Sequence, residues 1–338
     1  MSVAVVGATG VVGREMFRVL EQRQFPISKL KALASARSVG LEARCNGRTV
    51  QVEELTEDSF DDVDIALFSA GADVSLVYAP PAVEAGALVI DNSSAWRQRE
   101  NVPLVVPEVN PQDIAEHEGI IANPNCCAIP LSVVLKPLAQ AVGLRRVLIS
   151  TYQAASGAGK ALVDELQDQI SSIASGHTPE TVVYPHQLAH NAVPGGWKPA
   201  EEGYNEEEIK LVNETRKILH RPDLRISATC VRIPVPIGHG ESVFIETDKM
   251  ITADEARTLL GSAPGVIVED DPVAKLYPTP QSVAGKDEVY VGRIRNDLSD
   301  SHGLAFWIVS DNLRKGAALN AVQIAERALE TGALRRAS

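Results

Sequence analysis

Long apolar runs and CxxC cysteine pairs are both missing from this sequence of 338 residues. No apolar run approaches the roughly 18 residues that a membrane-spanning helix needs. The N-terminus carries no basic segment followed by a cleavage site, as a secretory signal would. The four cysteines lack the spacing of a zinc site or a disulfide framework. We therefore expect a cytoplasmic protein that holds no metal.

Basic residues are also fewer than acidic residues. The sequence has 32 Lys and Arg against 44 Asp and Glu, which gives a formal net charge of -12. Proteins that bind nucleic acids or anionic membranes neutralise phosphates with Lys and Arg. We therefore expect neither partner, and small molecules instead. An anionic substrate needs a local basic pocket that works against the overall field.

The first 100 residues alternate strand-like and helix-like patterns. A glycine-rich turn follows the first predicted strand and leads into a predicted helix at Val11–Arg23, where apolar side chains recur at helical spacing. Strands that alternate with helices are typical of a Rossmann-type, doubly wound parallel sheet in an α/β fold. The strands are predicted at Val3–Val6, Leu30–Ala34, Ile65–Ser69 and Ala87–Asp91.

Beyond Asn125 the pattern becomes that of an α+β domain with a largely antiparallel sheet. Apolar spacing at Lys315–Glu330 predicts a final helix that packs back on the first domain. We therefore expect a nucleotide-binding domain at 1–125 plus the C-terminal helix 315–338, and a catalytic and dimerisation domain at 126–314. The second domain has predicted strands at Val147–Gln153, Ile226–Pro234, Ser242–Thr247 and Gly303–Val309, and predicted helices at Ala161–Ala174 and Glu206–Leu219.

A dinucleotide-binding turn is predicted at the end of the first strand. Its glycines have the spacing G-x-x-G-x-x-G, a variant of G-x-G-x-x-G, between a strand and a helix. Glycines let the backbone approach a pyrophosphate, whose charge the helix N-terminus stabilises. The residues expected to bind the cofactor are Gly7, Thr9, Gly10, Val11, Val12 and Gly13.

The end of the second strand indicates which cofactor is bound. NAD enzymes place Asp or Glu there to hold the ribose 2′-hydroxyl, whereas this chain has Ala-Ser-Ala-Arg-Ser at 34–38. Arg37 offers a planar cation and Ser35 a hydroxyl to a 2′-phosphate. NADP is therefore predicted. The alternative is that Arg37 is a solvated loop residue.

A candidate nucleophile, Cys126, follows Asn-Pro-Asn and precedes an apolar helix that starts near Ile129. A cysteine at a helix N-terminus has a lowered pKa, and the free N–H groups there can stabilise an oxyanion. The alternative is a cysteine that packs as a small apolar side chain. We interpret Cys45, Cys127 and Cys230 in that way.

Eight different short motifs follow one another along nearly the whole chain. They are Gly-Ala-Thr-Gly-x-Val-Gly at 7–13, Ala-Ser-Ala-Arg-Ser at 34–38, Phe-Ser-Ala-Gly at 68–71, Ile-Asp-Asn-Ser-Ser-Ala-Trp-Arg at 90–97, Asn-Pro-Asn-Cys at 123–126, Gln-Ala-Ala-Ser-Gly-Ala-Gly at 153–159, Arg-Ile-Pro-Val at 232–235 and Gly-His-Gly-Glu at 238–241. Together they resemble the bacterial aspartate-semialdehyde dehydrogenases. Motifs in this order are much more specific than any one of them.

The resemblance implies a catalytic set. It makes Cys126 the nucleophile, His239 the general acid and base, and Gln153 the residue that orients the acyl intermediate. His239 also fits by itself, because the flanking glycines let substrate approach and imidazole titrates near neutrality. Cys127 departs from the family, which more often has Ser or Thr at that position.

Contacts to substrate and cofactor are implied too. Arg232 becomes the bidentate clamp on the substrate α-carboxylate, and an Arg inside an apolar strand needs a buried anion in any case. Glu207 becomes the contact to the amino group and Lys210 a phosphate ligand. The Glu run at 206–208 leaves this register open, and a solvated Glu207–Lys210 ion pair is the alternative. The remaining implied contacts are Arg97 and Asn125 to substrate, with Arg97 on the phosphate, and Ser69, Gly71, Ser156, Gly157, Gly159 and Asn312 to NADP.

The implied activity is the NADPH-dependent reduction of L-aspartyl 4-phosphate to L-aspartate 4-semialdehyde through a cysteine thioester. That reaction serves the biosynthesis of lysine through diaminopimelate, and of threonine and methionine. A homodimer or homotetramer is implied, with the loop-rich segment 176–203 as a candidate interface. Two other functions stay open, an N-acetyl-glutamyl-phosphate reductase and a non-catalytic NADP-binding paralogue. Glyceraldehyde-phosphate dehydrogenase fits less well, because its Ser-Cys-Thr-Thr-Asn motif is missing.

Overall fold

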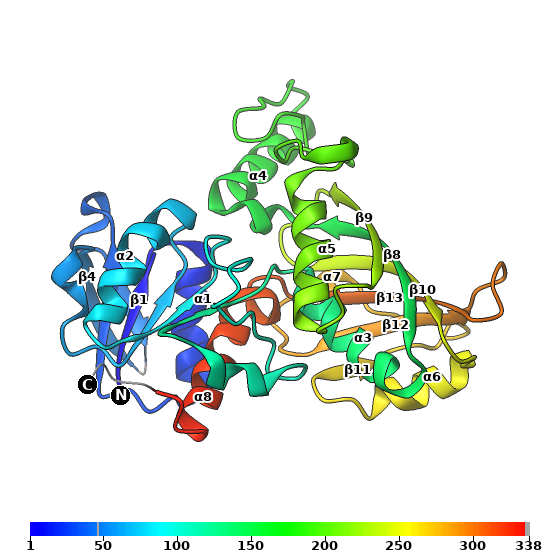
Figure 1. Cartoon of the computed structure of the whole chain (residues 1–338). Coiled ribbons are helices and arrows are strands. Elements are labelled where there is room, and N and C mark those ends of the chain that lie inside the picture. The colour runs from blue at the N-terminus through cyan, green and yellow to red at the C-terminus, as the bar shows by residue number, and fades with distance from the viewer. Residues whose placement is uncertain (46, 335–338) are drawn as a thin grey trace. The chain divides into compact units, whose positions relative to one another are not determined.

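The computed structural model describes residues 1–45 and 47–334, which form two compact units, each with its own sheet (Figure 1). The first unit comprises Met1–Asn125 and the C-terminal segment from Ala317, and the second comprises Cys126–Gly316. Among the residues described, every helix is too short or too polar to span a bilayer.

The first unit contains a seven-stranded sheet in the order β3-β4-β2-β1-β5-β6-β7. Neighbouring strands are parallel except β3 and β4, an antiparallel pair at one edge. Every residue of the central strand β1 is buried, as expected for a strand that is covered on both faces. The predicted doubly wound sheet is confirmed. Its strands are β1 Ser2–Val6, β2 Lys29–Ala34, β3 Glu42–Cys45, β4 Arg48–Glu54, β5 Ile65–Phe68, β6 Leu88–Asp91 and β7 Ile120–Ala122.

The C-terminal helix α8 packs beside α1 in the first unit (Figure 1). Val322 and Ala325 of α8 join the core formed by α1 and β1, which confirms the predicted packing. The helix ends at Glu330 and not at 338, because Gly332 turns the chain with a φ of +70°. Residues 335–338 of that prediction lie outside the described residues. The helices of this unit are α1 Val11–Gln22, α2 Ala72–Glu84 and α8 Leu319–Glu330, with short 3₁₀ turns η1 Ala36–Ser38, η2 Glu57–Phe60 and η3 Pro111–Glu116.

The second unit contains a six-stranded sheet in the order β11-β12-β13-β10-β8-β9. The pairs β8–β9 and β11–β12 are parallel, and the three other pairs are antiparallel. The prediction of a largely antiparallel second sheet is therefore confirmed. Its strands are β8 Leu144–Gln153, β9 Arg225–Arg232, β10 His239–Thr247, β11 Val266–Val268, β12 Val289–Asn296 and β13 Gly303–Ser310.

Helices α3, α5 and α6 cover one face of this second sheet (Figure 1). Side chains alternate along its strands, so that β8 buries Ile149, Thr151 and Gln153 on the covered face and half-exposes Leu148 on the other. The covered face therefore holds both apolar and polar side chains. The helical segments of this unit are α3 Ala128–Val142, α4 Lys160–Ala174, α5 Glu206–Ile218, α6 Ala253–Gly261, α7 Pro280–Val283, η4 Ala155–Ala158, η5 Glu201–Gly203 and the π-helical η6 Arg314–Ala318.

Candidate active site

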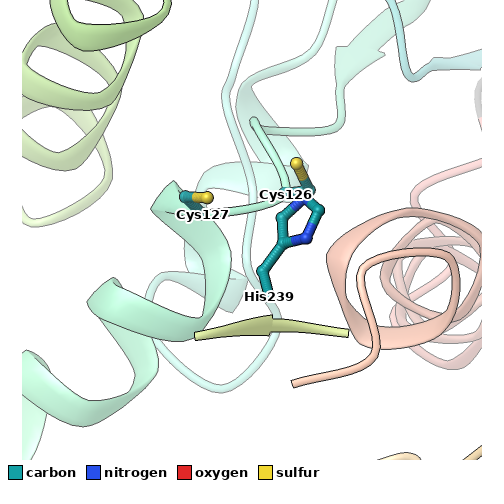
Figure 2. Close-up of side chains that lie close together, drawn as sticks. All are labelled: Cys126, Cys127 and His239. Atoms are coloured by element: carbon teal, nitrogen blue, oxygen red, sulfur yellow. The ribbon is translucent and has the colours of Figure 1, made fainter. Parts of the chain in front are cut away.

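Cys126 and Cys127 lie at the N-terminal end of α3, which begins at Ala128, close to the predicted Ile129 (Figure 2). Cys126 is partly exposed and Cys127 is fully buried. Gly316 packs directly against Cys126, since a Cβ added there would lie 3.0 Å from the Cys126 Cβ. Sequence reasoning missed Gly316, because nothing in its local pattern points to a cysteine so distant in sequence.

His239 begins β10 and is buried. Its Nδ1 accepts a hydrogen bond of 3.0 Å from the backbone N–H of Ala154, so the neutral ring carries its proton on Nε2. Nε2 has no hydrogen-bonding partner among the described residues. A ring nitrogen of His239 and the Sγ atoms of Cys126 and Cys127 all lie within 4.8 Å of one another (Figure 2). The structure therefore brings two of the predicted catalytic residues together.

The two adjacent thiols differ in charge state. A hydrogen bond from Cys127 and the nearby His239 and Arg232 hold the pKa of Cys126 well below its usual value, and they outweigh the opposing effect of burial. The pKa of Cys127 is raised well above the usual value, because its hydrogen takes part in that bond and its surroundings are buried. Of the two thiols, Cys126 is therefore the one that loses its proton at the lower pH.

Arg232 is a buried cation beside this thiolate. It ends β9, where it pairs in register with Gln153 of β8, and it is 2% exposed. Its Nη1 donates to the Ala154 carbonyl at 2.7 Å, and its guanidinium lies 4.9 Å from the centre of the Trp197 ring. Within the described part of the chain Arg232 forms no salt bridge, and its Nε is unpartnered. A buried guanidinium in this state can bind an anion.

Glu207 is the acidic residue of α5 that enters the site. It is buried, and its Oε1 accepts a hydrogen bond of 3.2 Å from Gln153 Nε2. Glu206 instead pairs with Lys210 on the half-exposed side of the helix at 3.5 Å. Glu208 forms the reciprocal half of the helix cap with Asn205. The three glutamates at 206–208, whose register the sequence left open, therefore make three different sets of contacts.

A glycine loop lies against Arg232 and His239. A Cβ on Gly157 would lie 3.0 Å from Arg232 Nη1 and 3.1 Å from His239 Nε2. Ser156 and Asn312, two further predicted cofactor residues, are buried and joined by a hydrogen bond of 2.9 Å. Gly159 takes a φ of +92° at the start of α4. These four predicted cofactor contacts therefore belong to the second unit.

The predicted glycine turn lies in the first unit, between β1 and α1. A Cβ on Gly7 would lie 2.8 Å from the backbone of Ser69, and a Cβ on Gly13 would lie 2.2 Å from the Gly7 oxygen. Gly10 caps α1 without a side chain, so the first N–H groups of the helix stay available to an anion. The close backbone packing and the free N–H groups are the features expected of a turn that binds a pyrophosphate. Thr9, Val11 and Val12 belong to the same turn, and Gly71 caps α2 with a φ of +92°.

Ser35 and Arg37 follow β2 and are exposed, as a site for a 2′-phosphate requires. Arg97 is buried, and its Nη2 donates to the Asn92 carbonyl at 2.6 Å. Asn125, the last residue before the nucleophile, is buried as well. The site residues predicted from the sequence therefore come from both units.

One buried acid near the thiols had no predicted role. Glu241 lies on β10 and is 1% exposed. It follows His239 by two residues, and period-two alternation places both on one strand face. The spacing of two residues between His239 and Glu241 is the signal in the sequence that could have pointed to Glu241. Nothing local indicated which face of the strand would be covered.

Two family models match the chain. Residues 2–117 match the NAD binding domain of semialdehyde dehydrogenase, and residues 135–315 match the semialdehyde dehydrogenase dimerisation domain. The aspartate-semialdehyde dehydrogenase of Bacillus subtilis (strain 168) is 50% identical over 96% of both chains, and that of Aquifex aeolicus (strain VF5) is 51% identical over 98% of both. The chain belongs to the aspartate-semialdehyde dehydrogenase family.

Solved structures of aspartate-semialdehyde dehydrogenases share its fold. The crystal structure of enzyme II from Vibrio cholerae, complexed with ASA, has a TM-score of 0.94 and 46% identity, and covers 97% of this chain and 98% of that one. The Candida albicans enzyme, solved with NADP, has a TM-score of 0.76 and 25% identity, over 98% and 100%. The resemblance seen in the motifs is confirmed, and the comparisons favour this family over the two alternatives left open by the sequence.

Proposed function

We propose that the chain reduces L-aspartyl 4-phosphate to L-aspartate 4-semialdehyde with NADPH, releasing phosphate. The observation that carries this proposal is a cysteine at a helix N-terminus, whose Sγ lies within 4.8 Å of a ring nitrogen of a buried histidine. A thiolate at such a place attacks an acyl carbon, and the helix N–H groups and Nε2–H can stabilise the oxyanion that forms. The relatives reported above are named aspartate-semialdehyde dehydrogenases.

The chain's own residues act in two stages. Cys126 attacks the acyl phosphate carbonyl carbon, the bond to phosphate breaks, and a thioester remains. Bound NADPH supplies the hydride that reduces this thioester. Nε2–H of His239 donates a hydrogen bond to the oxyanion at each stage, and the Cys126 thiolate leaves as the aldehyde forms. This tautomer supplies the donor half of the acid and base role predicted for His239.

Recognition of the substrate is assigned here to charged and polar side chains of the site. Arg232 has no acidic partner among the described residues, so its guanidinium fork is available to the α-carboxylate. In this proposal Glu207 contacts the amino group and Gln153 orients the acyl group, and the two side chains are joined by a hydrogen bond of 3.2 Å. Lys210 and Arg97 supply cations for the phosphate. These roles predict a preference for a short substrate with a free amino group.

NADP is the proposed cofactor form, because Ser35 and Arg37 stand exposed after β2 where an NAD enzyme has a carboxylate. Arg37→Ala should raise the KM for NADP much more than the KM for NAD. Arg48→Ala, an exposed arginine on β4, is the matched control and should change neither constant. Equal losses for both cofactors would contradict the assignment.

We propose that two copies associate through the open face of the second sheet. Leu148 and Phe244 on that face are 37% and 38% exposed, and Tyr152 and Trp307 lie beside them with ring centres 5.3 Å apart. An exposed apolar sheet face is typical of an interaction surface, and this part of the chain matches a dimerisation domain. The loop-rich segment 176–203 is a second candidate interface. A cytoplasmic location is supported by four cysteines that are all free.

The assay that tests the function is phosphate-dependent reduction of NADP⁺ with aspartate semialdehyde, beside N-acetylglutamate semialdehyde and glyceraldehyde 3-phosphate. We expect turnover with the first substrate alone, and loss of turnover in Cys126→Ser. Turnover with N-acetylglutamate semialdehyde would favour the reductase alternative. Binding of NADP with no turnover on any substrate would favour the non-catalytic paralogue.

A further inference from the structure

Asn92 and Asn123 stand in two of the motifs described above, and the proposed reaction gives neither a role. They directly follow β6 and β7, neighbouring parallel strands whose register pairs Asp91 with Ala122. The two asparagines therefore lie side by side at the carboxyl ends of the strands, where doubly wound folds bind ligands. The proposed phosphate ligand Arg97 follows Asn92 in the same loop.

Three asparagines form a row of side-chain hydrogen bonds at this edge, the asparagine network. Asn320, in the first turn of α8, donates from Nδ2 to Asn123 Oδ1 at 2.7 Å, and Asn123 donates from Nδ2 to Asn92 Oδ1 at 2.8 Å. Asn92 donates from Nδ2 to the Phe68 carbonyl, at the end of β5, at 2.9 Å. Asn123 and Asn320 are 1% and 0% exposed.

Backbone carbonyls fix the direction of these hydrogen bonds at both ends. The Phe68 carbonyl only accepts, so Asn92 must turn its Nδ2 toward it. The Val105 carbonyl fixes Asn320 in the same way, through a hydrogen bond of 2.9 Å. Asn123 must therefore accept from Asn320 and donate to Asn92. A side chain at position 123 needs one acceptor and one donor in these places.

The network also holds the main chain that carries Arg97. Arg97 Nη2 donates to the Asn92 carbonyl at 2.6 Å, and the side chain of Asn92 is bound at both Oδ1 and Nδ2. Rotation of the Asn92 peptide would break these bonds. The Asn123 N–H in turn donates to the Asp91 carbonyl at 2.8 Å. The acceptor of Arg97 is therefore fixed through the asparagine side chains.

We propose that Asn123 is a positioning residue for phosphate binding, because it fixes the Asn92 carbonyl that holds Arg97. In this scheme Asn123 acts through Asn92 and Arg97, and Asn320 acts through Asn123. The inference rests on the proposed function, which assigns the phosphate to Arg97. The glycine turn at 7–13 is not part of the network, so NADP binding should not depend on it.

The test is the KM for inorganic phosphate in the phosphate-dependent reduction of NADP⁺ with aspartate semialdehyde. Asn123→Ala should raise this KM about tenfold, the equivalent of about one hydrogen bond to a charged group, and leave the KM for NADP⁺ unchanged. Asn320→Ala should raise the phosphate KM as well. Gln323→Ala, which removes an amide of α8 that donates to Glu108, is the matched control and should change neither constant.

Asn123→Asp gives a readout that a general loss of stability would not produce. An ionised carboxylate accepts from Asn320 but faces Asn92 Oδ1 and the Ala317 carbonyl, two oxygens that only accept. A protonated carboxyl has an O–H for Asn92 Oδ1. The phosphate KM of Asn123→Asp, relative to wild type at the same pH, should therefore be near the wild-type value at low pH. It should rise about tenfold as the acid ionises, above the ordinary range because the site is buried.

The titratable groups on elements packed around the network are the same in every variant. They include Asp91 of β6, Arg97 in the loop after it, Glu108, and Asp113 and Glu116 of η3, which packs against α8. A pH step seen in Asn123→Asp and missing from Asn123→Ala therefore reports the introduced acid.

An unchanged phosphate KM in Asn123→Ala, equal rises for phosphate and NADP⁺, or a pH-independent ratio in Asn123→Asp would overturn the proposal. Protection of Cys126 from iodoacetamide by inorganic phosphate measures phosphate affinity without turnover. If phosphate protects the wild-type chain and no turnover occurs, the proposed function is wrong, and the same variants compared by protection still test the network. If phosphate neither protects Cys126 nor supports turnover, both proposals are wrong.

Discussion

At the scale of single residues, Arg232 is the side chain on which substrate affinity should depend most. Arg232→Lys keeps the charge but loses the fork that binds a carboxylate through two hydrogen bonds. We expect the KM for aspartate semialdehyde to rise roughly tenfold, the equivalent of one charge-assisted hydrogen bond. Arg145→Lys, at an exposed ion pair with Asp248, is the matched control and should leave KM unchanged. An unchanged KM in Arg232→Lys would remove Arg232 from the substrate site.

Cys126 and Cys45 should react with a thiol reagent in different pH ranges. The thiolate is the reactive form, and the pKa of Cys126 lies well below its usual value, so its labelling should persist to lower pH than that of an ordinary thiol and should fall as pH drops through that lowered pKa. Burial, and to a lesser degree Glu21, raise the pKa of Cys45 to about 11. Cys45 should therefore remain unlabelled below about pH 10 in the folded chain. Peptide mapping after short exposure to iodoacetamide at pH 6, 7 and 8 measures both.

Single residues differ in how far sequence could predict them. Cys126 and His239 stand in motifs whose chemistry is local, a thiol before a helix and an imidazole between glycines. Glu241 and Gly316 acquire their places from tertiary structure. One depends on which face of β10 is covered, and the other approaches Cys126 from nearly 200 residues away in the chain. No local pattern carries that information.

At the scale of elements, the cap of α5 fixes where Glu207 points. Asn205 accepts from the N–H groups of Glu207 and Glu208, so Asn205→Ala should cost about 1 kcal/mol of unfolding free energy and also raise KM. Thr252 caps α6 in the same way, and none of the proposed site residues lies on α6. Thr252→Ala should therefore cost similar stability and leave KM unchanged. Urea unfolding and steady-state kinetics on both variants make the comparison, and a shift in KM in both would contradict it.

Elements with a strong pattern of their own were predictable. The strands at β1, β8 and β10 and the helices α4 and α5 agree with the sequence to within a few residues. The sequence interpretation missed β3 and β7, which have four and three residues, because so short a segment becomes a strand through its neighbours. It also missed α2, where Pro80 and Pro81 break the expected helical pattern.

At the scale of the whole molecule, self-association tests the open face of the second sheet. Phe244 stands on that face with the guanidinium of Arg295 over its ring at 5.6 Å. Phe244→Glu places a charge where the proposed partner would exclude water, so the dimer should dissociate at micromolar concentration in sedimentation velocity. Val77→Glu, at a more exposed apolar position on α2 of the first unit, should remain dimeric. If Phe244→Glu remains dimeric, the open sheet face is not the interface, and the loop segment 176–203 becomes the candidate. If the wild-type chain is monomeric, the dimer proposal is wrong.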